Sequence, residues 1–157
     1  MGLRDLTPEE THIVLASERI VRLAFQAGGE VFVVPVFYVW KDNALNGFTT
    51  PGRKTRMAGE NPHVGFQIDS TVETGPWEWA SVSGNGAFEI IDDPAEAMSF
   101  AVDLGDRLAD APAWAQQELE SRFQRLGRIA WRLRPQTLHG RAHGPGEGHD
   151  EPSPAVP

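Results

Sequence analysis

The chain has 157 residues, of which 40% are hydrophobic, and it carries a formal charge of −8 at pH 7. This length and composition predict one globular domain with a core of its own. Because the sequence has no cysteine, disulfides, thiolate nucleophiles and cysteine-based metal sites are excluded. The acidic charge argues against general nucleic-acid binding, which requires a basic face, but it permits a small anionic ligand held by a local group of cations.

The sequence shows no sign of a membrane segment. No run of residues is apolar over the roughly 20 positions that a membrane helix needs. The first residues do not resemble a signal peptide either. We therefore expect a cytoplasmic protein that does not act at a membrane.

The N-terminal part is predicted to form one helix and then strands. The stretch "TPEE" at residues 7–10 is a capping box with proline in the first turn, so a helix should begin there and run to about Ser17. Pro35 lies in an apolar strand, where it marks a sheet edge, a bulge or a backbone that faces a ligand. Strands rich in β-branched and aromatic residues, separated by turn residues, are expected over residues 20–26, 30–40 and 44–50.

The remaining elements alternate in the same way. A second capping box at Asp93 and a proline at residue 112 should each begin a helix, the latter ending at Gly127. Gly84 permits a bulge or a close backbone approach within its strand. Short central strands with helices at the ends predict an α+β fold built on a small antiparallel barrel. The other expected elements are a helix over residues 51–60 and strands over residues 63–69, 77–91 and 128–135.

A change of composition marks the C-terminal end. Residues 140–157 hold four prolines and four glycines, and almost nothing that joins a core. We predict a flexible tail over these residues, following a domain that spans residues 1–139. His139, His143 and His149 suggest a metal site, but their glycine-rich context and the missing carboxylate pattern favour solvated side chains.

The stretch "TTPGRK" at residues 49–54 combines several features of an anion site where a strand meets a helix. The helix start exposes unpaired amides and a partial positive charge, and Gly52 allows a ligand close to the backbone. The hydroxyls of Thr49 and Thr50 can donate, while Arg53 and Lys54 supply positive charge. A phosphate monoester would satisfy this group. The alternative is a surface helix with two solvated cations.

Two tryptophans flank an acidic residue in the strand expected over residues 77–91. Trp77 and Trp79 alternate with Glu78, so both indoles are predicted to face the same way. Such a pair forms part of a core or an interface, or else the wall of a cofactor site. Glu78 is the one candidate acid or base in this stretch, and a solvated carboxylate is the alternative role.

Three stretches in this order, "VVPVFYVW", "GFTTPGRKTRMAGENPHVGFQID" and "WEWASVSGNGAFEIIDDP", resemble the FMN-binding split β-barrel family of pyridoxamine 5′-phosphate oxidase and its relatives. The resemblance covers roughly residues 18–94. It implies an antiparallel split β-barrel of about six strands, of Greek-key type, with an N-terminal helix and C-terminal helices. It also implies a homodimer with FMN in a groove at the subunit boundary.

The resemblance also implies which residues hold the cofactor. Arg53 and Lys54 match the family's phosphate-binding pair, and Phe48 and Thr49 match its aromatic–Thr pair. Trp79 falls where the oxidase has a glutamine that contacts the flavin. The strand whose backbone follows the isoalloxazine edge corresponds to residues 33–36. The full predicted set is Val33, Val34, Pro35, Val36, Phe48, Thr49, Thr50, Arg53, Lys54 and Trp79.

Departures from the family pattern restrict the function that the resemblance implies. The oxidase's C-terminal Arg-x-His element, which grips the substrate's phosphate, has no counterpart in "WRLRP" at residues 131–135. Thr49 and Thr50 stand where nitroimidazole-resistance relatives have a histidine. We therefore expect a flavin-dependent oxidoreductase that reduces a small planar substrate, rather than pyridoxamine 5′-phosphate oxidase itself. Tyr38 is a candidate donor to the flavin or substrate, or else a packed strand residue.

Two other classes of function stay open. One is a domain that binds FMN, haem or a deazaflavin without turnover, and His12 and His63 are the two histidines of the body available to a haem. The other is a structural dimer without a cofactor. The sequence leaves two roles open for the C-terminal helices, which are covering the cofactor mouth and thickening the dimer contact.

Overall fold

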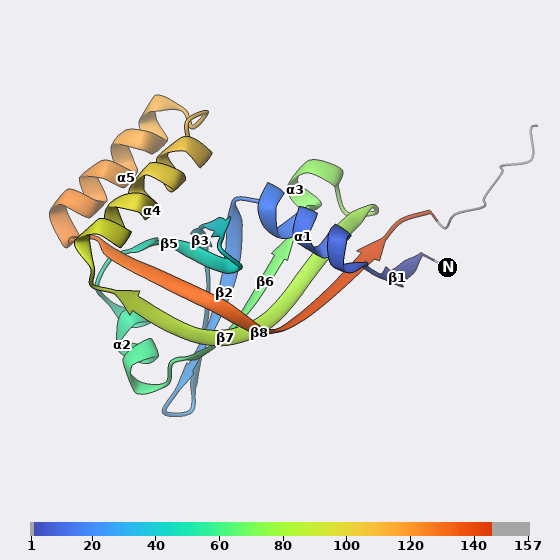
Figure 1. The fold of residues 1–157 in the computed structure, drawn as a ribbon, viewed down its shortest axis with the longest axis horizontal. Helices are drawn as coiled ribbons and strands as arrows, with labels where there is room; N and C mark the ends of the chain where they lie inside the picture. The colour runs from blue at the N-terminus through green and yellow to red at the C-terminus, as the bar shows by residue number, and fades with distance from the viewer. Residues whose placement is uncertain (1, 146–157) are drawn as a thin grey trace, which may run out of the picture.

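The computed structural model describes residues 2–145, which form one curled antiparallel sheet with helices around it (Figure 1). This arrangement confirms the predicted α+β split-barrel fold. The strands are β1 (Leu3–Asp5), β2 (Ile20–Ala27), β3 (Glu30–Phe37), β4 (Val39–Lys41), β5 (Ala44–Thr49), β6 (His63–Asp69), β7 (Trp79–Ile91) and β8 (Ile129–His143). The helices are α1 (Pro8–Ser17), α2 (Arg53–Glu60), α3 (Thr71–Thr74), α4 (Pro94–Arg107) and α5 (Ala113–Leu126).

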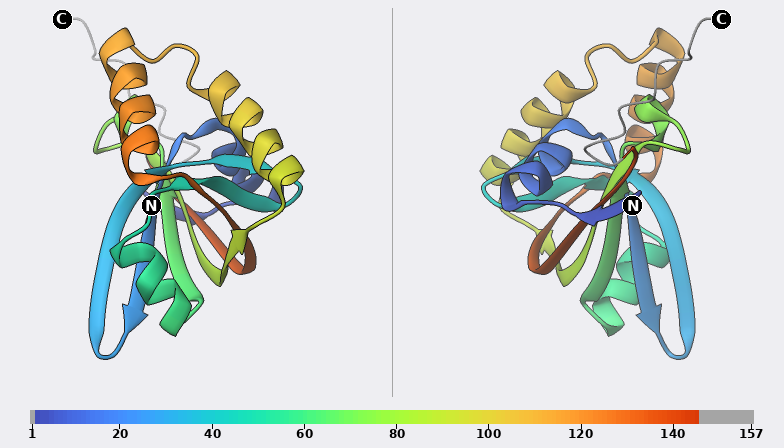
Figure 2. Two further views of the ribbon diagram at one scale, coloured as in Figure 1. Left: turned by 90° about the vertical axis from the view of Figure 1, so that its left-hand side faces the viewer. Right: turned by 90° about the vertical axis from the view of Figure 1, so that its right-hand side faces the viewer.

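The strand order is β3-β2-β6-β7-β8-β5-β4, and β1 pairs with β8 off this path. β3 is therefore an edge strand that pairs only with β2, where Pro35 lies opposite Arg22. This confirms the edge position among the three roles that Pro35 suggested, because a proline lacks the N–H that a second neighbour would require. The α4–α5 hairpin and the β2–β3 turn lie at opposite ends of the molecule (Figure 2).

The sheet curls because one residue connects its two ends. β3 and β4 are the first and last strands of the order, yet only Tyr38 separates them in the chain. Tyr38 is fully buried, its hydroxyl donates to the Leu15 carbonyl over 2.7 Å, and its amide donates to the Arg19 carbonyl over 3.0 Å. The strand predicted over residues 30–40 is thus two strands, because the chain changes its pairing partner from β2 to β5 at this tyrosine.

The buried side chains form two clusters. The larger one fills the barrel and includes Phe25, Ile68 and Trp131. The smaller one lies between the barrel and the C-terminal hairpin, and it includes Phe48 of β5 and Phe100 of α4. All six residues of β5 are buried, because one face of this strand meets the barrel core and the other meets the hairpin.

Of the two capping boxes that the sequence predicted, one forms completely and the other forms in part. At α1 the box is complete, since Thr7 Oγ1 accepts from the Glu10 amide and Glu10 Oε2 accepts from the Thr7 amide. At α4 only half of the expected box forms. Asp93 accepts from the Glu96 amide over 3.0 Å, but the Glu96 carboxylate pairs with Arg132 of β8 instead. Glu96 therefore fixes the helix to the sheet.

The final strand is longer than predicted. β8 continues from residue 135 to His143, where it pairs with both β7 and β1. The boundary predicted after residue 139 is therefore too early, because residues 140–143 belong to the sheet. The rest of the predicted tail, including His149, lies outside the described residues apart from residues 144 and 145. The three-residue strand β1 and the four-residue helix α3 were not predicted.

Close backbone contacts occur at Gly84, as its position in the strand indicated. A Cβ atom at Gly84 would lie 2.0 Å from the carbonyl oxygen of Thr137 on β8. The register of the two strands shifts at the next step, between Asn85 and Gly86.

No helix in residues 2–145 is long and apolar enough to cross a membrane.

Candidate functional site

A pocket of about 300 Å³ lies between the barrel and the C-terminal hairpin. Seven of the ten residues predicted to bind the cofactor line it, namely Val34, Pro35, Val36, Phe48, Thr49, Thr50 and Lys54. The hairpin contributes Leu104 and Leu108 from the α4 side and Leu119, Arg122 and Phe123 from α5. Of the two roles left open for the C-terminal helices, the structure supports covering the site. Whether the seven residues bind a cofactor stays a prediction.

One part of the pocket is apolar. The edge strand β3 supplies Val34, Pro35 and Val36, and the facing hairpin supplies leucine side chains. Val33 shares a face of β3 with Pro35, but it does not line the pocket and its side chain is 59% exposed. Val33 is therefore not part of the pocket wall, although the prediction included it. Apolar walls of this kind suit the flat face of an aromatic ligand.

The opposite part of the pocket is polar and positively charged. Thr49 is buried at the end of β5, and its hydroxyl has only a 3.5 Å contact with the Thr50 carbonyl. Lys54, in the first turn of α2, has no hydrogen bond or ion pair within residues 2–145. Burial lowers the pKa of Lys54, and the nearby charge of Arg122 lowers it further. Both effects would be offset by an anion between the two cations.

Arg53 does not accompany Lys54 into the pocket. Its guanidinium forms an ion pair with Glu30 and lies 4.2 Å from the ring centroid of Phe32. Successive helix residues point about 100° apart, so one of two adjacent cations must face elsewhere. The structure thus separates the pair that the sequence presented as a unit.

Trp79 lies far from the pocket within one chain. It pairs with His143 at the last residue of β8, whereas Thr49 beside the pocket pairs with Ile129 at the first. The Trp79 indole stacks on the His143 ring at a centroid distance of 5.6 Å. The prediction that Trp77 shares its strand face is wrong, because β7 begins at Trp79 and Trp77 is 77% exposed. Glu78 is also exposed, just before the strand.

β8 does contain an Arg-x-His triplet, contrary to the expectation from residues 131–135. Arg141, Ala142 and His143 lie at the end of β8 that is remote from the pocket. His143 Nδ1 lies 2.5 Å from the Trp77 carbonyl oxygen, so this ring is already engaged with its neighbours. The sequence-based search missed the triplet because it assigned these residues to a tail.

The other candidate residues from the sequence do not line the pocket. The Tyr38 hydroxyl is occupied by the Leu15 carbonyl, and burial raises the pKa of this tyrosine well above its usual range. His12 meets the edge of Trp40 beside α1, and His63 is exposed at the start of β6. Within residues 2–145, no cluster of three or more histidine or acidic side chains is arranged to hold a metal.

Arg122 is the charged pocket residue that sequence reasoning missed. It follows Leu119 by three positions and precedes Phe123, both of which belong to the apolar stripe of α5. An apolar stripe indicates that this face of α5 is covered by another part of the protein. Residues beside the stripe lie at the edge of that contact. Its proximity to Lys54 depends on how the hairpin folds back over β5, which no local pattern encodes.

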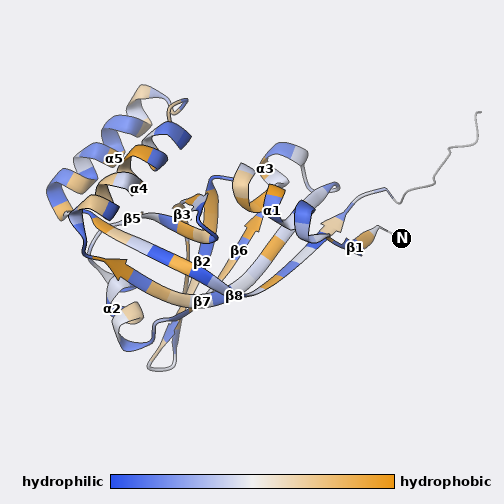
Figure 3. Ribbon diagram, viewed as in Figure 1, coloured by the Kyte–Doolittle hydropathy of each residue, from blue (hydrophilic) through white to orange (hydrophobic). Residues whose placement is uncertain are grey.

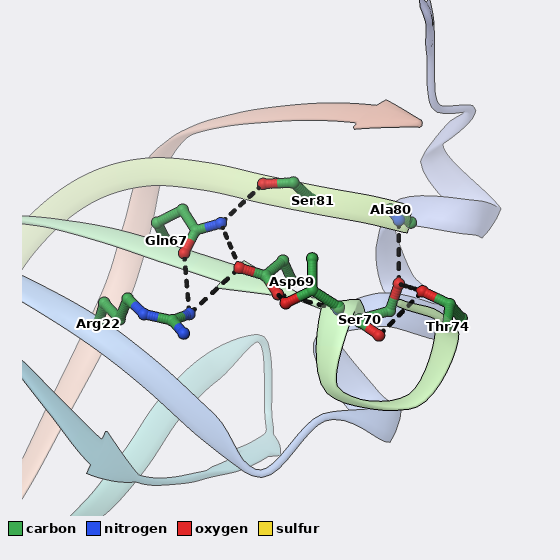
Figure 4. A network of polar contacts seen from close by, with 8 residues as sticks. Arg22, Gln67, Asp69, Ser70, Thr74, Ala80 and Ser81 are labelled. Carbon is green, nitrogen blue, oxygen red and sulfur yellow. Dashed lines mark hydrogen bonds and ion pairs between the residues drawn. The ribbon is translucent and has the colours of Figure 1, made fainter. Parts of the chain in front are cut away.

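A second polar cluster lies where β6 ends and α3 begins (Figure 4). Asp69 accepts from Arg22 at 3.1 Å and from Gln67 at 2.9 Å, and Gln67 also donates to Ser81. Burial opposes ionisation of Asp69, but hydrogen bonds from Thr71 and Gln67 outweigh it and lower the pKa. The members satisfy one another, so the cluster anchors α3 to the sheet rather than offering a binding site.

Comparisons with known proteins agree with this geometry. Residues 7–142 match the family model described as pyridoxamine 5′-phosphate oxidase. A Rhizobium meliloti protein without an assigned function is 31% identical over 84 residues, which are 54% of this chain. The match spans about half of that relative, 56% of its length.

Solved structures share the fold over most of the chain. A FAD-binding protein from Mesorhizobium loti superposes with a TM-score of 0.71 at 25% identity, covering 92% of this chain and all of that one. The haem storage protein HutZ from Vibrio cholerae has a TM-score of 0.69 at 17% identity, over 87% and 96% of the two chains. A 5-nitroimidazole resistance protein from Bacteroides thetaiotaomicron has a TM-score of 0.66 at 13% identity, over 90% and 89%.

Proposed function

Because the chain belongs to the pyridoxamine 5′-phosphate oxidase family, we propose that its pocket binds a flavin nucleotide and that it is an FMN-dependent oxidoreductase. The supporting observation is the pocket's division into an apolar part beside β3 and a cationic part around Lys54. A flavin nucleotide has the matching division into a flat ring system and a phosphate. The prediction of a cytoplasmic location stays a prediction.

The residues present fit such a cofactor. The buried Thr49 hydroxyl and the unpaired Lys54 ammonium are suitable donors for phosphate oxygens, since charge-assisted hydrogen bonds to phosphate are strong. The backbone of residues 34–36 and the hairpin leucines would hold the ring and exclude water from it. When bound, the flavin would supply the electron-transfer chemistry, and the chain would orient it toward a small planar substrate.

Within residues 2–145 no histidine, aspartate or glutamate lines the pocket. This favours chemistry in which the protein supplies no proton, and it equally suits a carrier that binds without turnover. The second candidate function is therefore a cofactor-binding module without catalysis. Its ligand would be a flavin or haem, as in the structurally similar proteins named for FAD binding and haem storage.

One spectrum identifies the cofactor. We expect the purified protein, or protein reconstituted with FMN, to show the two visible-range bands of an oxidised flavin, and denaturation to release FMN identified by mass. Release of FAD would correct the cofactor and keep the flavin assignment. A Soret band would favour the haem module, and no binding of either cofactor would refute the proposal. Turnover is tested by photoreducing the bound flavin and following its reoxidation by small nitro and quinone compounds.

We also propose that the active form is a homodimer with the cofactor at the subunit boundary. Trp79 begins β7 opposite His143, at the end of β8 remote from the pocket, so contact with a flavin would require a second subunit. The outer face of the edge strand β3 offers apolar surface for such a contact, with Val31 64% and Val33 59% exposed.

A further inference from the structure

The α4–α5 hairpin brings a charged residue to the pocket. Arg122 lines the pocket together with Lys54, although 68 positions separate them in the chain. α5 has no buried residue and is mostly hydrophilic (Figure 3), so its contribution to the core is small. Leu119 and Phe123 form the part of α5 that meets the pocket.

The charges around Arg122 are not balanced within the protein. Arg122 Nε and Nη2 both donate to Glu118 Oε1 of the same helix, at 3.1 and 2.5 Å. Within residues 2–145, Nη1 has no hydrogen bond and Lys54 has no acidic partner. A guanidinium has five N–H donors, so Glu118 leaves part of the Arg122 fork for another acceptor. Two cations at one pocket, with a single carboxylate paired to Arg122, leave a site that attracts an anion.

The hairpin is positioned firmly enough to hold Arg122 in place. Three ion pairs tie its first helix and its connecting loop to the barrel, and these are Glu96–Arg132, Asp103–Lys41 and Asp110–Arg19. Arg107 adds hydrogen bonds to the backbone carbonyls at the end of α1. These contacts attach the part of the hairpin that precedes α5, the helix that carries Arg122.

We propose that Arg122 is a phosphate-binding residue, and that it and Lys54 grip the phosphate of the flavin nucleotide from the hairpin and from α2. This inference rests on the proposed flavin function and adds a specificity determinant to it. Recognition of the phosphate would then depend on the C-terminal hairpin as well as on the strand–helix junction at residues 49–54. The pocket would select flavin nucleotides over riboflavin, which lacks the phosphate.

The test compares Arg122→Ala with Arg125→Ala, a matched arginine one turn further along α5 that does not line the pocket. Dissociation constants for FMN and riboflavin are measured by flavin fluorescence on apoprotein. Arg122→Ala should weaken FMN binding by about tenfold or more, the range expected for a lost charged hydrogen bond, and should leave riboflavin unchanged. Arg125→Ala should change neither ligand. Thermal unfolding of each apoprotein variant reports whether the fold is intact.

The outcomes separate this inference from the proposed function. If wild-type protein binds FMN and Arg122→Ala binds it equally well, the role of Arg122 is refuted and the flavin function stands. Equal losses for FMN and riboflavin would also refute it, since Arg122 would then act on the shape of the pocket. Wild-type protein that binds no flavin would overturn the proposed function and this inference together. Should the alanine variant unfold, Arg122→Lys keeps the charge without the planar fork and should bind FMN with intermediate affinity.

Discussion

Lys54 and Arg53 are neighbours in the sequence but have different surroundings in the fold. Lys54 faces the pocket without a partner among the described residues, whereas Arg53 is held by Glu30 and Phe32. The sequence predicted an anion site at this junction from local features, namely a strand end, a glycine and a helix start, and the structure has a pocket there. It could not assign the cations individually, because Glu30 reaches Arg53 only after β2 and β3 have paired.

We predict that Lys54→Ala weakens FMN binding by about 1.5–3 kcal/mol, as expected for loss of a charged hydrogen bond. Riboflavin affinity should hardly change, and Arg53→Ala should have a smaller effect on FMN because its guanidinium is already engaged. Isothermal titration of the apoprotein variants measures all three. If Arg53→Ala costs as much as Lys54→Ala, Arg53 must leave Glu30 when the ligand binds, and the family's paired arrangement would apply after all.

Glu18 provides a pH-dependent contribution to stability. Its pKa is raised to about 7, chiefly by burial and also by a hydrogen bond with Glu73 and the charges of Glu73 and Asp69, while Arg107 opposes them. The folded protein therefore binds this proton more tightly than the unfolded chain, whose glutamates titrate near 4.5. The resulting stabilisation is complete below the unfolded pKa and is lost as the pH rises through about 7.

We expect the urea midpoint of the wild-type protein to fall between about pH 5 and pH 8. Glu18→Gln should remove this contribution to the fall, because the amide keeps a hydrogen bond without a titrating proton. Identical slopes for wild type and Glu18→Gln would contradict the prediction.

The elements that the sequence predicted well carry their own signals. The capping residues of α1 and the proline at the start of α4 lie beside the residues that they organise, so these helices were located to within a few positions. The three-residue strands β1 and β4 have no such signal, because each exists only where a long partner supplies hydrogen bonds. The length of β8 was missed for the same reason, since its one proline, Pro135, and its one glycine, Gly140, are both accommodated by pairing with β7.

The β7–β8 ribbon provides a test of packing at a glycine. Gly84→Ala should destabilise the protein by about 1–3 kcal/mol or more, because its new Cβ would overlap the Thr137 carbonyl of β8. Gly59→Ala is the matched control, since this glycine lies in α2 with nothing within 4 Å of the new atom. There alanine should stabilise the helix slightly. Denaturant unfolding measures both, and equal effects would show that the approach of the two strands is not limiting.

The position of Trp79 has consequences for the molecule as an assembly. It begins β7 opposite the end of β8 that is remote from the pocket, so in the proposed dimer it would serve the pocket of the other subunit. The family resemblance predicted Trp79 as a cofactor-binding residue. The sequence contained no information about which subunit's pocket Trp79 would serve. That depends on how two sheets meet, which is a property of surfaces rather than of local patterns.

We predict that dilution to monomer releases the flavin, because a site completed by two subunits loses contacts when they separate. Light scattering and flavin fluorescence, followed over the same dilution series, should change together. Trp79→Ala should weaken binding in the dimer. A demonstrated monomer that retains flavin with unchanged affinity would rule out the shared site.

Tyr38 joins strands at opposite ends of the sheet, and the pocket has walls from both ends, Val36 on β3 and Phe48 on β5. A ligand bound between these walls would stabilise the closed barrel, and closure of the barrel would in turn favour ligand binding. Saturating ligand should therefore slow amide hydrogen exchange at residues 36–40, whereas loosening this connection by inserting glycines after Tyr38 should reduce affinity without altering any residue that lines the pocket.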